Sequence, residues 1–281
     1  MTLNIRQITP LIGAEITGAD MANDDHLSQI WQAFADHSVI AIRDLDFSPD
    51  DHLAFARSWG TINVNRFFKP VDGFPEIATV LKEADQKSAI GENWHTDHSY
   101  DAEPAMCSML YAREVPDVGG DTCFASQAAA YDVLSPGMQK TLCDMKAWHS
   151  SRHAFGQSLQ ETESHKDGRL GNEDKATQDA LHPVVIRNPR SGRKCLYVNG
   201  DFTTHFDGWN LEESTPLLRQ LYAHCSRADL TCRISYRPNT LVIWDNLAVQ
   251  HMAINDYAGH RRLMHRITLE GTAPEAANFS D

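Results

Sequence analysis

The sequence predicts a mainly β protein with flanking helices, folded as a barrel or a double-sheet jelly roll. Short apolar, β-branched segments dominate the second half of the chain, turn residues separate them, and few helical segments accompany them. A chain of 281 residues can bury a substantial core in one domain. Because no repeat or long linker divides the sequence, we expect a single domain over residues 1–281.

Strand and helix alternate in the first sixty residues. The apolar, β-branched run 38–45 predicts a strand. Ser48 is followed three residues later by Asp51, which is the pattern of a capping box at the start of a helix. We therefore expect a short helix over 52–60, where Gly60 ends it.

Two longer helices and several further strands are expected in the rest of the chain. The helices cover residues 127–145 and 212–226, where apolar residues recur at helical spacing. The strands cover residues 107–115, 182–186, 194–199, 231–238, 240–246 and 262–270. Residues 156–181 are polar and too numerous for a plain connection, so we expect a lid or loop insertion there.

Composition limits the possible partners. The formal net charge of −13 disfavours binding to nucleic acid and to anionic membranes. No apolar run approaches the roughly eighteen residues that cross a bilayer, and the six cysteines form no CxxC pair. We expect a soluble, cytoplasmic protein in which any anionic ligand meets a local cationic pocket.

The segment NWHTDHSY carries the most specific local signal. His95 and Asp97 are two residues apart, so on an extended strand their side chains point to the same face. A histidine and a carboxylate side by side form part of a metal site, which iron(II) oxygenases complete with a second, remote histidine. His251, at the end of an apolar run, is the candidate for this third ligand.

A pair of arginines follows on the last long strand. Even spacing places Arg262 and Arg266 on one face, together with Met264 and Thr268, while the alternate residues are more apolar. If this face lines the barrel interior, each guanidinium requires a buried anion, because an unpaired interior charge is very costly. The pattern favours two arginines directed at a cavity.

Taken in order, the motifs of this chain resemble one enzyme family. They are WHTD (94–97), GGDT (119–122), HPVV (182–185), LYVN (196–199), FTT (202–204), WDN (244–246), QH (250–251) and NDYAGHRRLMHR (255–266). This ordered set resembles the taurine dioxygenase family of iron(II)- and 2-oxoglutarate-dependent oxygenases, which includes aryloxyalkanoate dioxygenases. The resemblance extends from about the first strand to Gly271 and implies a double-stranded β-helix, a form of jelly roll.

The resemblance also implies which residues bind the metal and the cosubstrate. His95, Asp97 and His251 correspond to the iron ligands. Arg262, helped by the hydroxyl of Thr122, corresponds to the group that holds the distal carboxylate of 2-oxoglutarate, for which the planar guanidinium suits bidentate pairing. The implied cofactors are Fe(II), with 2-oxoglutarate and O2 as cosubstrates. Trp244 is expected to pack beside this site.

The expected substrate residues follow the same resemblance. Arg266 matches the position that pairs with the sulfonate in the taurine enzyme, and Phe155 and Phe202 match aromatic wall positions. Aromatic residues at such places are otherwise ordinary core.

This chain departs from the taurine enzyme at the substrate pocket. Asn65 and Phe68 stand where taurine dioxygenases carry a sulfonate-binding histidine and a tyrosine. Gly91 replaces an asparagine that positions taurine, and Ala154, beside Phe155, replaces a serine. We expect a roomier pocket that accepts a longer or ring-bearing anion.

The sequence therefore predicts a dioxygenase that hydroxylates a small organic anion. A sulfonate or sulfate ester larger than taurine is favoured, giving sulfite or sulfate and an aldehyde, with succinate and CO2. An aryloxyalkanoate or another carboxylate is the alternative substrate. A non-catalytic metal-binding jelly roll and a zinc enzyme also remain open at this point. Family members often form dimers or tetramers, so we expect a homo-oligomer.

Overall fold

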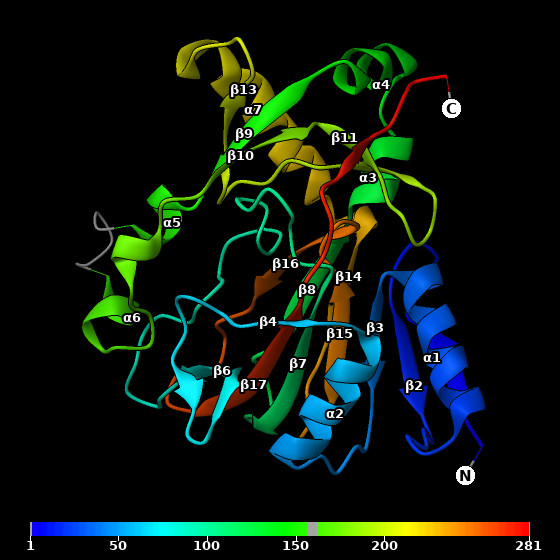
Figure 1. Ribbon diagram of the computed structural model, residues 1–281, viewed down its shortest axis with the longest axis vertical. Helices are drawn as coiled ribbons and strands as arrows, with labels where there is room; N and C mark the ends of the chain where they lie inside the picture. Colours follow the sequence, from blue (N-terminus) through cyan, green and yellow to red (C-terminus); the bar gives the residue numbers. More distant parts are fainter. Residues whose placement is uncertain (1, 157–161, 281) are drawn as a thin grey trace.

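A large, mostly antiparallel sheet forms the centre of the molecule (Figure 1). The computed structural model describes residues 2–156 and 162–280. The strand order in the large sheet is β1 (Asn4–Gln7), β2 (Ala14–Thr17), β3 (Val39–Ile42), β15 (Leu241–Asp245), β7 (Cys107–Glu114), β17 (Arg262–Leu269), β6 (Phe74–Lys82) and β5 (Pro70–Val71), with β4 (Ile62–Asn63) paired to β17. Only β2 and β3 run parallel among its described neighbours.

The central strands β3 and β15 of the large sheet are buried on both faces, which explains why they are nearly continuous apolar runs. Side chains alternate between the two faces along each strand. On β15, Leu241 and Ile243 pack in an outer core, whereas Val242 and Trp244 pack in an inner core. Two helices, α1 (Asp24–His37) and α2 (Pro49–Trp59), cover the outer core. The buried face of α1 includes Phe34.

The inner face packs against a smaller sheet, as a jelly roll requires. This sheet has the order β14 (Thr231–Ile234), β8 (Thr122–Ser126) and β16 (Val249–Ala253). Phe124, Ile234 and Val249 from its strands share the inner core with Trp244 and Met264 of the large sheet. The predicted fold class, mainly β with a double-sheet jelly roll, is confirmed.

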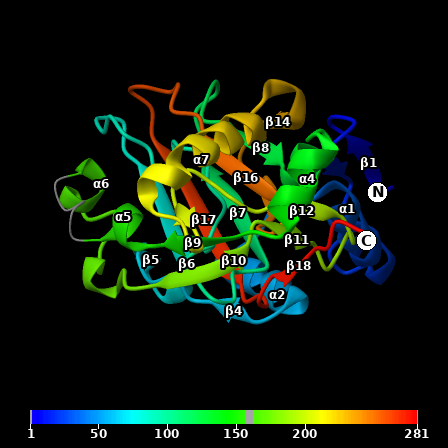
Figure 2. The same cartoon turned by 90° about the horizontal axis from the view of Figure 1, so that it is seen from above.

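Further strands and helices lie around the two sheets, most of them toward the end that is uppermost in Figure 1, with α6 lower at the left. The strands form two small sheets, β10 (Asp179–Pro183) with β9 (Lys146–Ser150) and β13 (Thr203–Phe206), and β12 (Lys194–Leu196) with β11 (Val185–Arg187) and β18 (Glu275–Ala276). The helices are α3 (Gln127–Asp132), α4 (Pro136–Cys143), α5 (Arg152–Phe155), α6 (Glu163–Lys166) and α7 (Leu211–Cys225), with 3-10 turns at Glu173–Lys175 and Ala228–Leu230. Figures 1 and 2 agree that α6 lies on the opposite side of the molecule from α1.

The helix predictions are confirmed in two places and wrong in one. Ser48 and Asp51 form the expected capping box at the start of α2, and α7 matches the helix expected over 212–226. The single helix expected over 127–145 is two helices, because Ser135 caps α4 and Pro136 occupies its first turn. Proline cannot continue a helix from the preceding residues, and it is well placed at a helix start.

The strand predictions were correct in location but often too long. The segment expected as one strand over 182–186 is divided at Val184 between β10 and β11, which belong to different sheets. The polar stretch 156–181 contains α6 and part of β10 in its described portion, and residues 157–161 lie outside the described residues. Within the described ranges, no helix combines the length and the apolar character needed to span a bilayer.

His52 on α2 gives the fold a pH-dependent stability. Its ring is fully buried against Tyr111, and neither ring nitrogen has a hydrogen-bond partner among the described residues. Burial, with smaller effects of His265 and Arg113, lowers the pKa of His52 to about 3. An unfolded histidine titrates near about 6.5, so the unfolded chain binds more protons between these values. The contribution of His52 is therefore complete above about pH 6.5 and is lost as the pH falls toward about 3.

We expect the His52→Leu variant to lose less stability on acidification than the original protein. Urea unfolding at pH 7 and at pH 5 measures this as a smaller decrease in the free energy of unfolding. The exposed His260 provides the control, because His260→Leu should leave the decrease unchanged. Equal decreases in all three proteins would show that His52 is not a buried neutral ring.

Candidate active site

A cavity of about 450 Å³ opens between the two sheets of the jelly roll. Its wall is built from strands of both sheets, from the segment before β7, and from the segments around α5 and α6. Every residue selected from the sequence as a site residue lies on this wall: Asn65, Phe68, Gly91, His95, Asp97, Thr122, Phe155, Phe202, Trp244, His251, Arg262 and Arg266. Residues that are far apart in the chain are thus brought to one place.

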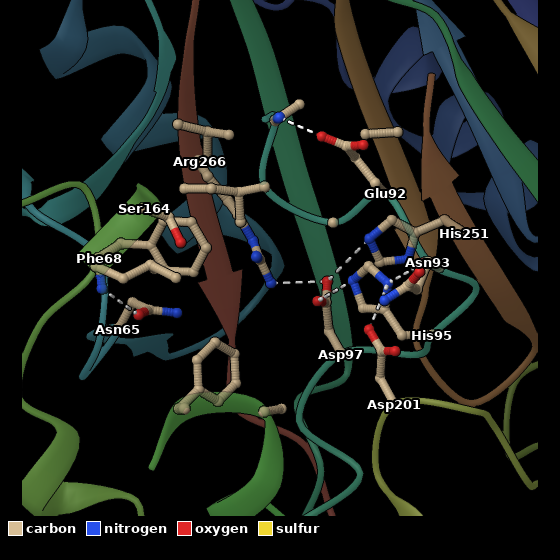
Figure 3. Close-up of a pocket in the computed structure, with 18 of the residues that line it drawn as sticks. Asn65, Phe68, Glu92, Asn93, His95, Asp97, Ser164, Asp201, His251 and Arg266 are labelled. Atoms are coloured by element: carbon tan, nitrogen blue, oxygen red, sulfur yellow. Dashed lines mark hydrogen bonds and ion pairs between the residues drawn. The ribbon is translucent and has the colours of Figure 1, made fainter. Parts of the chain in front are cut away.

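Three buried side chains converge in this cavity (Figure 3). One potential ligand atom from each of His95, Asp97 and His251 lies within 4.8 Å of the others. The Nε2 atoms of His95 and His251 lie 3.7 and 3.9 Å from the two carboxylate oxygens of Asp97. Two imidazoles and one carboxylate on one side of a cavity could hold a divalent metal and leave further coordination positions open.

The local backbone around these residues differs from the predicted extended strand. His95 pairs with His251 through two backbone hydrogen bonds in an isolated bridge, which places the two imidazoles side by side. After Thr96 the chain enters a turn, with His98 at a positive φ of 59°. Asp97 therefore reaches the cavity from the start of a turn. His95 and Asp97 do lie close together, but strand alternation is not the cause.

The carboxylate of Asp97 is fixed by groups on the large sheet. Its Oδ2 lies 2.7 Å from Nη2 of Arg266, and the hydroxyl of Ser108 donates to the same oxygen at 2.7 Å. Burial alone would raise the pKa of Asp97, but the charge of Arg266 opposes burial and holds this pKa well below its ordinary value. Asp97 is therefore an anion. Its Oδ1 lies on the side of the histidines, 3.7 Å from His95 Nε2.

Each of the two histidines is arranged so that a ring nitrogen can face a metal. Nδ1 of His95 lies 2.8 Å from the backbone carbonyl oxygen of Asn93, so a proton on Nδ1 leaves Nε2 with its lone pair. Burial holds the pKa of His251 well below its ordinary value, so this imidazole is neutral. Trp244 packs against the His251 ring, with ring centroids 4.7 Å apart.

Arg262 presents an unused donor beside the small sheet. Its Nε donates to the carbonyl of Gly120 at 3.0 Å, whereas its buried Nη2 has no partner among the described residues. Nearby, the hydroxyl of Tyr236 donates to Thr122 Oγ1 at 3.1 Å. Thr122 then retains its own hydroxyl proton for another acceptor. Arg262 and Thr122 together are suited to a carboxylate.

Asn65 and Phe68 form the opposite part of the wall. The Oδ1 of Asn65 accepts hydrogen bonds from the backbone N–H groups of Phe67 and Phe68 at 2.9 and 3.0 Å. This turn directs the amide nitrogen of Asn65 toward the cavity (Figure 3). The ring of Phe68 lies 5.6 Å from the guanidinium carbon of Arg266. The side chain of Asn65 is therefore oriented as a donor.

Gly91 has a different role from the one we expected. Its φ is +83°, and a Cβ at this position would lie 3.2 Å from Cε1 of His95. The backbone conformation and the approach of His95 therefore favour a glycine here, independently of any need for room in the pocket.

Aromatic rings form a further part of the wall. Phe67 and Phe155 are stacked with centroids 4.4 Å apart, and Tyr100 meets Phe155 and Phe202 edge to face. Leu170 adds to this cluster from the segment after α6. This part of the cavity is suited to an apolar or ring-bearing group.

Sequence reasoning missed several residues of the site. Ser108 and Tyr236 support Asp97 and Thr122, while Tyr100, Asp201 and His165 line the cavity itself. Of these residues, only Ser108 could have been recognised from the sequence, because it is a polar residue on the inward face of an otherwise apolar strand. The others lie on segments whose placement depends on tertiary contacts.

Comparison with known proteins places the chain in a family. A family model described as "Taurine catabolism dioxygenase TauD, TfdA family" matches residues 4–268. The chain is 31% identical to the "Alpha-ketoglutarate-dependent sulfonate dioxygenase" of Saccharomyces cerevisiae, over 97% of this chain and 68% of that protein. It is 31% identical to the "Alkylsulfatase" of Acinetobacter baylyi, over 98% of this chain and 87% of that protein.

Solved structures give the same result. A putative alpha-ketoglutarate-dependent taurine dioxygenase from Burkholderia xenovorans superposes with a TM-score of 0.81 at 26% identity, covering 97% of this chain and 94% of that chain. The structure of AAD-2 in complex with Mn(II) and N-oxalylglycine gives a TM-score of 0.79 at 26% identity, covering 98% and 99% of the two chains. The chain therefore belongs to the TauD, TfdA family and is an iron(II)- and 2-oxoglutarate-dependent dioxygenase.

Proposed function

We propose that this dioxygenase hydroxylates a sulfonate or sulfate ester larger than taurine, with His95, Asp97 and His251 as its iron ligands. The observation that carries the proposal is the buried Arg266 on the wall of a largely apolar cavity, next to the candidate metal ligands. Its Nε has no hydrogen-bond partner among the described residues, so it retains a donor for an anion.

The residues of the site fit iron and 2-oxoglutarate. Two imidazoles and an ionised carboxylate are a suitable ligand set for iron(II). The unpartnered Nη2 of Arg262 and the hydroxyl of Thr122 fit a carboxylate at the small-sheet side of the cavity. Iron(II) with 2-oxoglutarate and O2 supplies the oxidising chemistry, in which a substrate C–H bond is hydroxylated and 2-oxoglutarate becomes succinate and CO2.

The side chains of this protein hold and aim the reactants. In our proposal Arg262 and Thr122 hold the cosubstrate carboxylate, while Arg266 and the amide of Asn65 hold the substrate anion. Because a displacement of about one ångström can cost about a hundredfold in rate, the fixed position of Arg266 decides which carbon reacts. If that carbon bears the sulfur, the hydroxylated product loses a proton as its C–S bond breaks, giving an aldehyde and sulfite.

The relatives support an oxidised sulfur group on the substrate. They include a sulfonate dioxygenase, an alkylsulfatase and a sulfate ester dioxygenase. Asn65, Phe68 and Ala154 replace the histidine, tyrosine and serine of the taurine enzyme, and these changes together with the aromatic wall favour a longer or ring-bearing tail over taurine. An aryloxyalkanoate is the second candidate, favoured by the same aromatic wall.

A substrate panel tests the proposal. Alkyl sulfonates, alkyl sulfates, aryloxyalkanoates and taurine are each incubated with enzyme, Fe(II), 2-oxoglutarate and O2, and succinate is measured beside sulfite, sulfate or phenol. We expect a sulfonate or sulfate ester with a chain or ring to give one succinate per released anion. Turnover of taurine at an affinity equal to that of the best panel member would contradict the proposal, and phenol release would establish the second candidate.

Ser108 offers a test of how Asp97 is held. Replacing Ser108 by alanine removes the hydroxyl that donates to Asp97 Oδ2 and leaves Arg266, at 2.7 Å, as the nearest described partner of that oxygen. Groups that orient metal ligands typically contribute about 10- to 100-fold in metal affinity. We expect the Ser108→Ala variant to bind Fe(II) about tenfold more weakly under anaerobic dialysis. The exposed Ser235 gives the control, and unchanged affinity in Ser108→Ala would show that the hydroxyl does not position Asp97.

We further propose a cytoplasmic homo-oligomer, a dimer or tetramer. The described residues include all six cysteines, and each is a free thiol, as is common in a reducing compartment. Light scattering after size-exclusion chromatography measures the oligomeric state, and a monomer at micromolar concentration would contradict the proposal.

A further inference from the structure

Lys82 is a buried cation next to the cosubstrate side of the cavity. Its side chain lies at the end of β6, and the residue is only 3% exposed. Its Nζ has no hydrogen-bond partner among the described residues and lies 4.6 Å from the centre of the Tyr257 ring. A buried ammonium group without an anionic partner is costly, so its position requires an explanation.

The strand register places Lys82 beside Arg262. The two residues are direct partners in the antiparallel pair β6 and β17, and direct partners project from the same face of a sheet. Val80, two residues before Lys82 on the same face, lines the cavity with Arg262. Two buried cations therefore stand next to each other on the inner face of the large sheet.

The acidic groups nearby are already paired with other residues. Asp256 accepts from the N–H of Gly120 and forms an ion pair with Arg233. Glu83, the neighbour of Lys82 in sequence, pairs with Arg261. Neither carboxylate is thus directed at Lys82 or at the free Nη2 of Arg262. Glu92, whose charge acts on Tyr257, accepts hydrogen bonds from the Ala89 N–H and the Asn255 amide.

Tyr257 connects the two cations without neutralising either. A Cβ at Gly120 would lie 3.2 Å from Cδ of Arg262 and 3.3 Å from Cδ1 of Tyr257, so these side chains meet at this glycine. The ammonium group of Lys82 lies 4.6 Å from the centre of the same ring. An anion held by Arg262 would therefore lie in the field of both charges, in a region of low dielectric where such fields are strong.

We propose that Lys82 is a positioning residue of the cosubstrate site, whose positive charge strengthens the capture of the distal carboxylate of 2-oxoglutarate by Arg262. This inference rests on the proposed function of Arg262. Lys82 acts through its charge and through Arg262, since it stands behind the cavity wall. It also raises the preference for a dicarboxylate over a 2-oxo acid with an uncharged end.

The test compares two ligands that differ only at the far end. 2-Oxoglutarate and 2-oxobutyrate share the 2-oxo acid group, and only 2-oxoglutarate has the distal carboxylate. Their dissociation constants are measured by calorimetry on the full chain loaded with Mn(II), for the original protein, Lys82→Met, Lys82→Arg and the exposed control Lys69→Met.

We expect Lys82→Met to weaken 2-oxoglutarate binding about tenfold and to leave 2-oxobutyrate binding unchanged, because a charge-assisted interaction is worth about that factor. Lys82→Arg should retain most of the affinity, and Lys69→Met should bind both ligands as the original protein does. Equal weakening of both ligands would indicate a purely structural role and overturn the inference, as would no change for either. If the original protein fails to bind 2-oxoglutarate, the proposed function itself is wrong.

Discussion

The His251→Ala variant is expected to lose stoichiometric binding of Fe(II) and, with it, 2-oxoglutarate-dependent turnover. His251 belongs to the cluster of three candidate ligands whose atoms lie within 4.8 Å of one another, and its Nε2 lies 3.9 Å from Asp97. Even groups that merely orient metal ligands contribute about 10- to 100-fold in affinity, so removal of a ligand should cost at least about a hundredfold. Anaerobic equilibrium dialysis against Fe(II) measures the loss directly.

A matched variant separates this effect from general damage. His260 is exposed and does not line the cavity, so His260→Ala should bind one Fe(II) per chain like the original protein. Circular dichroism and thermal unfolding of His251→Ala without metal should show a folded protein. Retention of tight Fe(II) binding by folded His251→Ala would exclude this residue as a ligand.

The second large effect concerns the two arginines of β17. Arg266→Ala is expected to raise the KM for the anionic substrate about a hundredfold while changing the affinity for 2-oxoglutarate by no more than about threefold. Arg262→Ala is expected to do the reverse. The reason is their separation along the strand, since Arg266 faces Asp97 and Phe68, whereas Arg262 faces Gly120 and Tyr236. Calorimetry with 2-oxoglutarate and steady-state kinetics with the substrate found in the panel measure the two effects.

The conservative variant sharpens this comparison. Arg266→Lys keeps a positive charge near Asp97 but loses the planar group that can bind the carboxylate and a second anion at once. We expect it to restore little of the substrate affinity. Equal loss of substrate and cosubstrate affinity in both alanine variants would mean that the roles of the two arginines are divided wrongly.

Much of the fold could be predicted because the strands carry strong local signals. On β15 and β17 both faces are buried, so the apolar runs were readable, and even spacing correctly put Arg262, Met264 and Arg266 on the inner face. The break at Ser135 and Pro136 was also present in the sequence, although the periodicity on either side favoured one helix. The division at Val184 depends on which sheet each half joins, and no local pattern encodes it.

The residues selected from the sequence share one cavity, but their geometry there was predicted only in part. His95 and Asp97 were grouped by strand alternation, whereas the structure brings them together through a bridge to His251 and a turn with a positive φ at His98. Gly91 was interpreted as a loss of side-chain volume, and its backbone conformation gives the actual reason. Lys82 could not be found from the sequence, because its importance depends on the register of β6 against β17.

The most direct test of the account is an anaerobic titration of the protein with Fe(II) and then with 2-oxoglutarate, followed by absorption spectroscopy. We predict binding of one Fe(II) per chain and a charge-transfer band that forms only when both Fe(II) and 2-oxoglutarate are present. The band should be absent in His251→Ala and should require more 2-oxoglutarate in Arg262→Ala. A protein that binds no Fe(II), or that binds it and gives no band with 2-oxoglutarate, would contradict the assignment of this cavity as the oxygenase site.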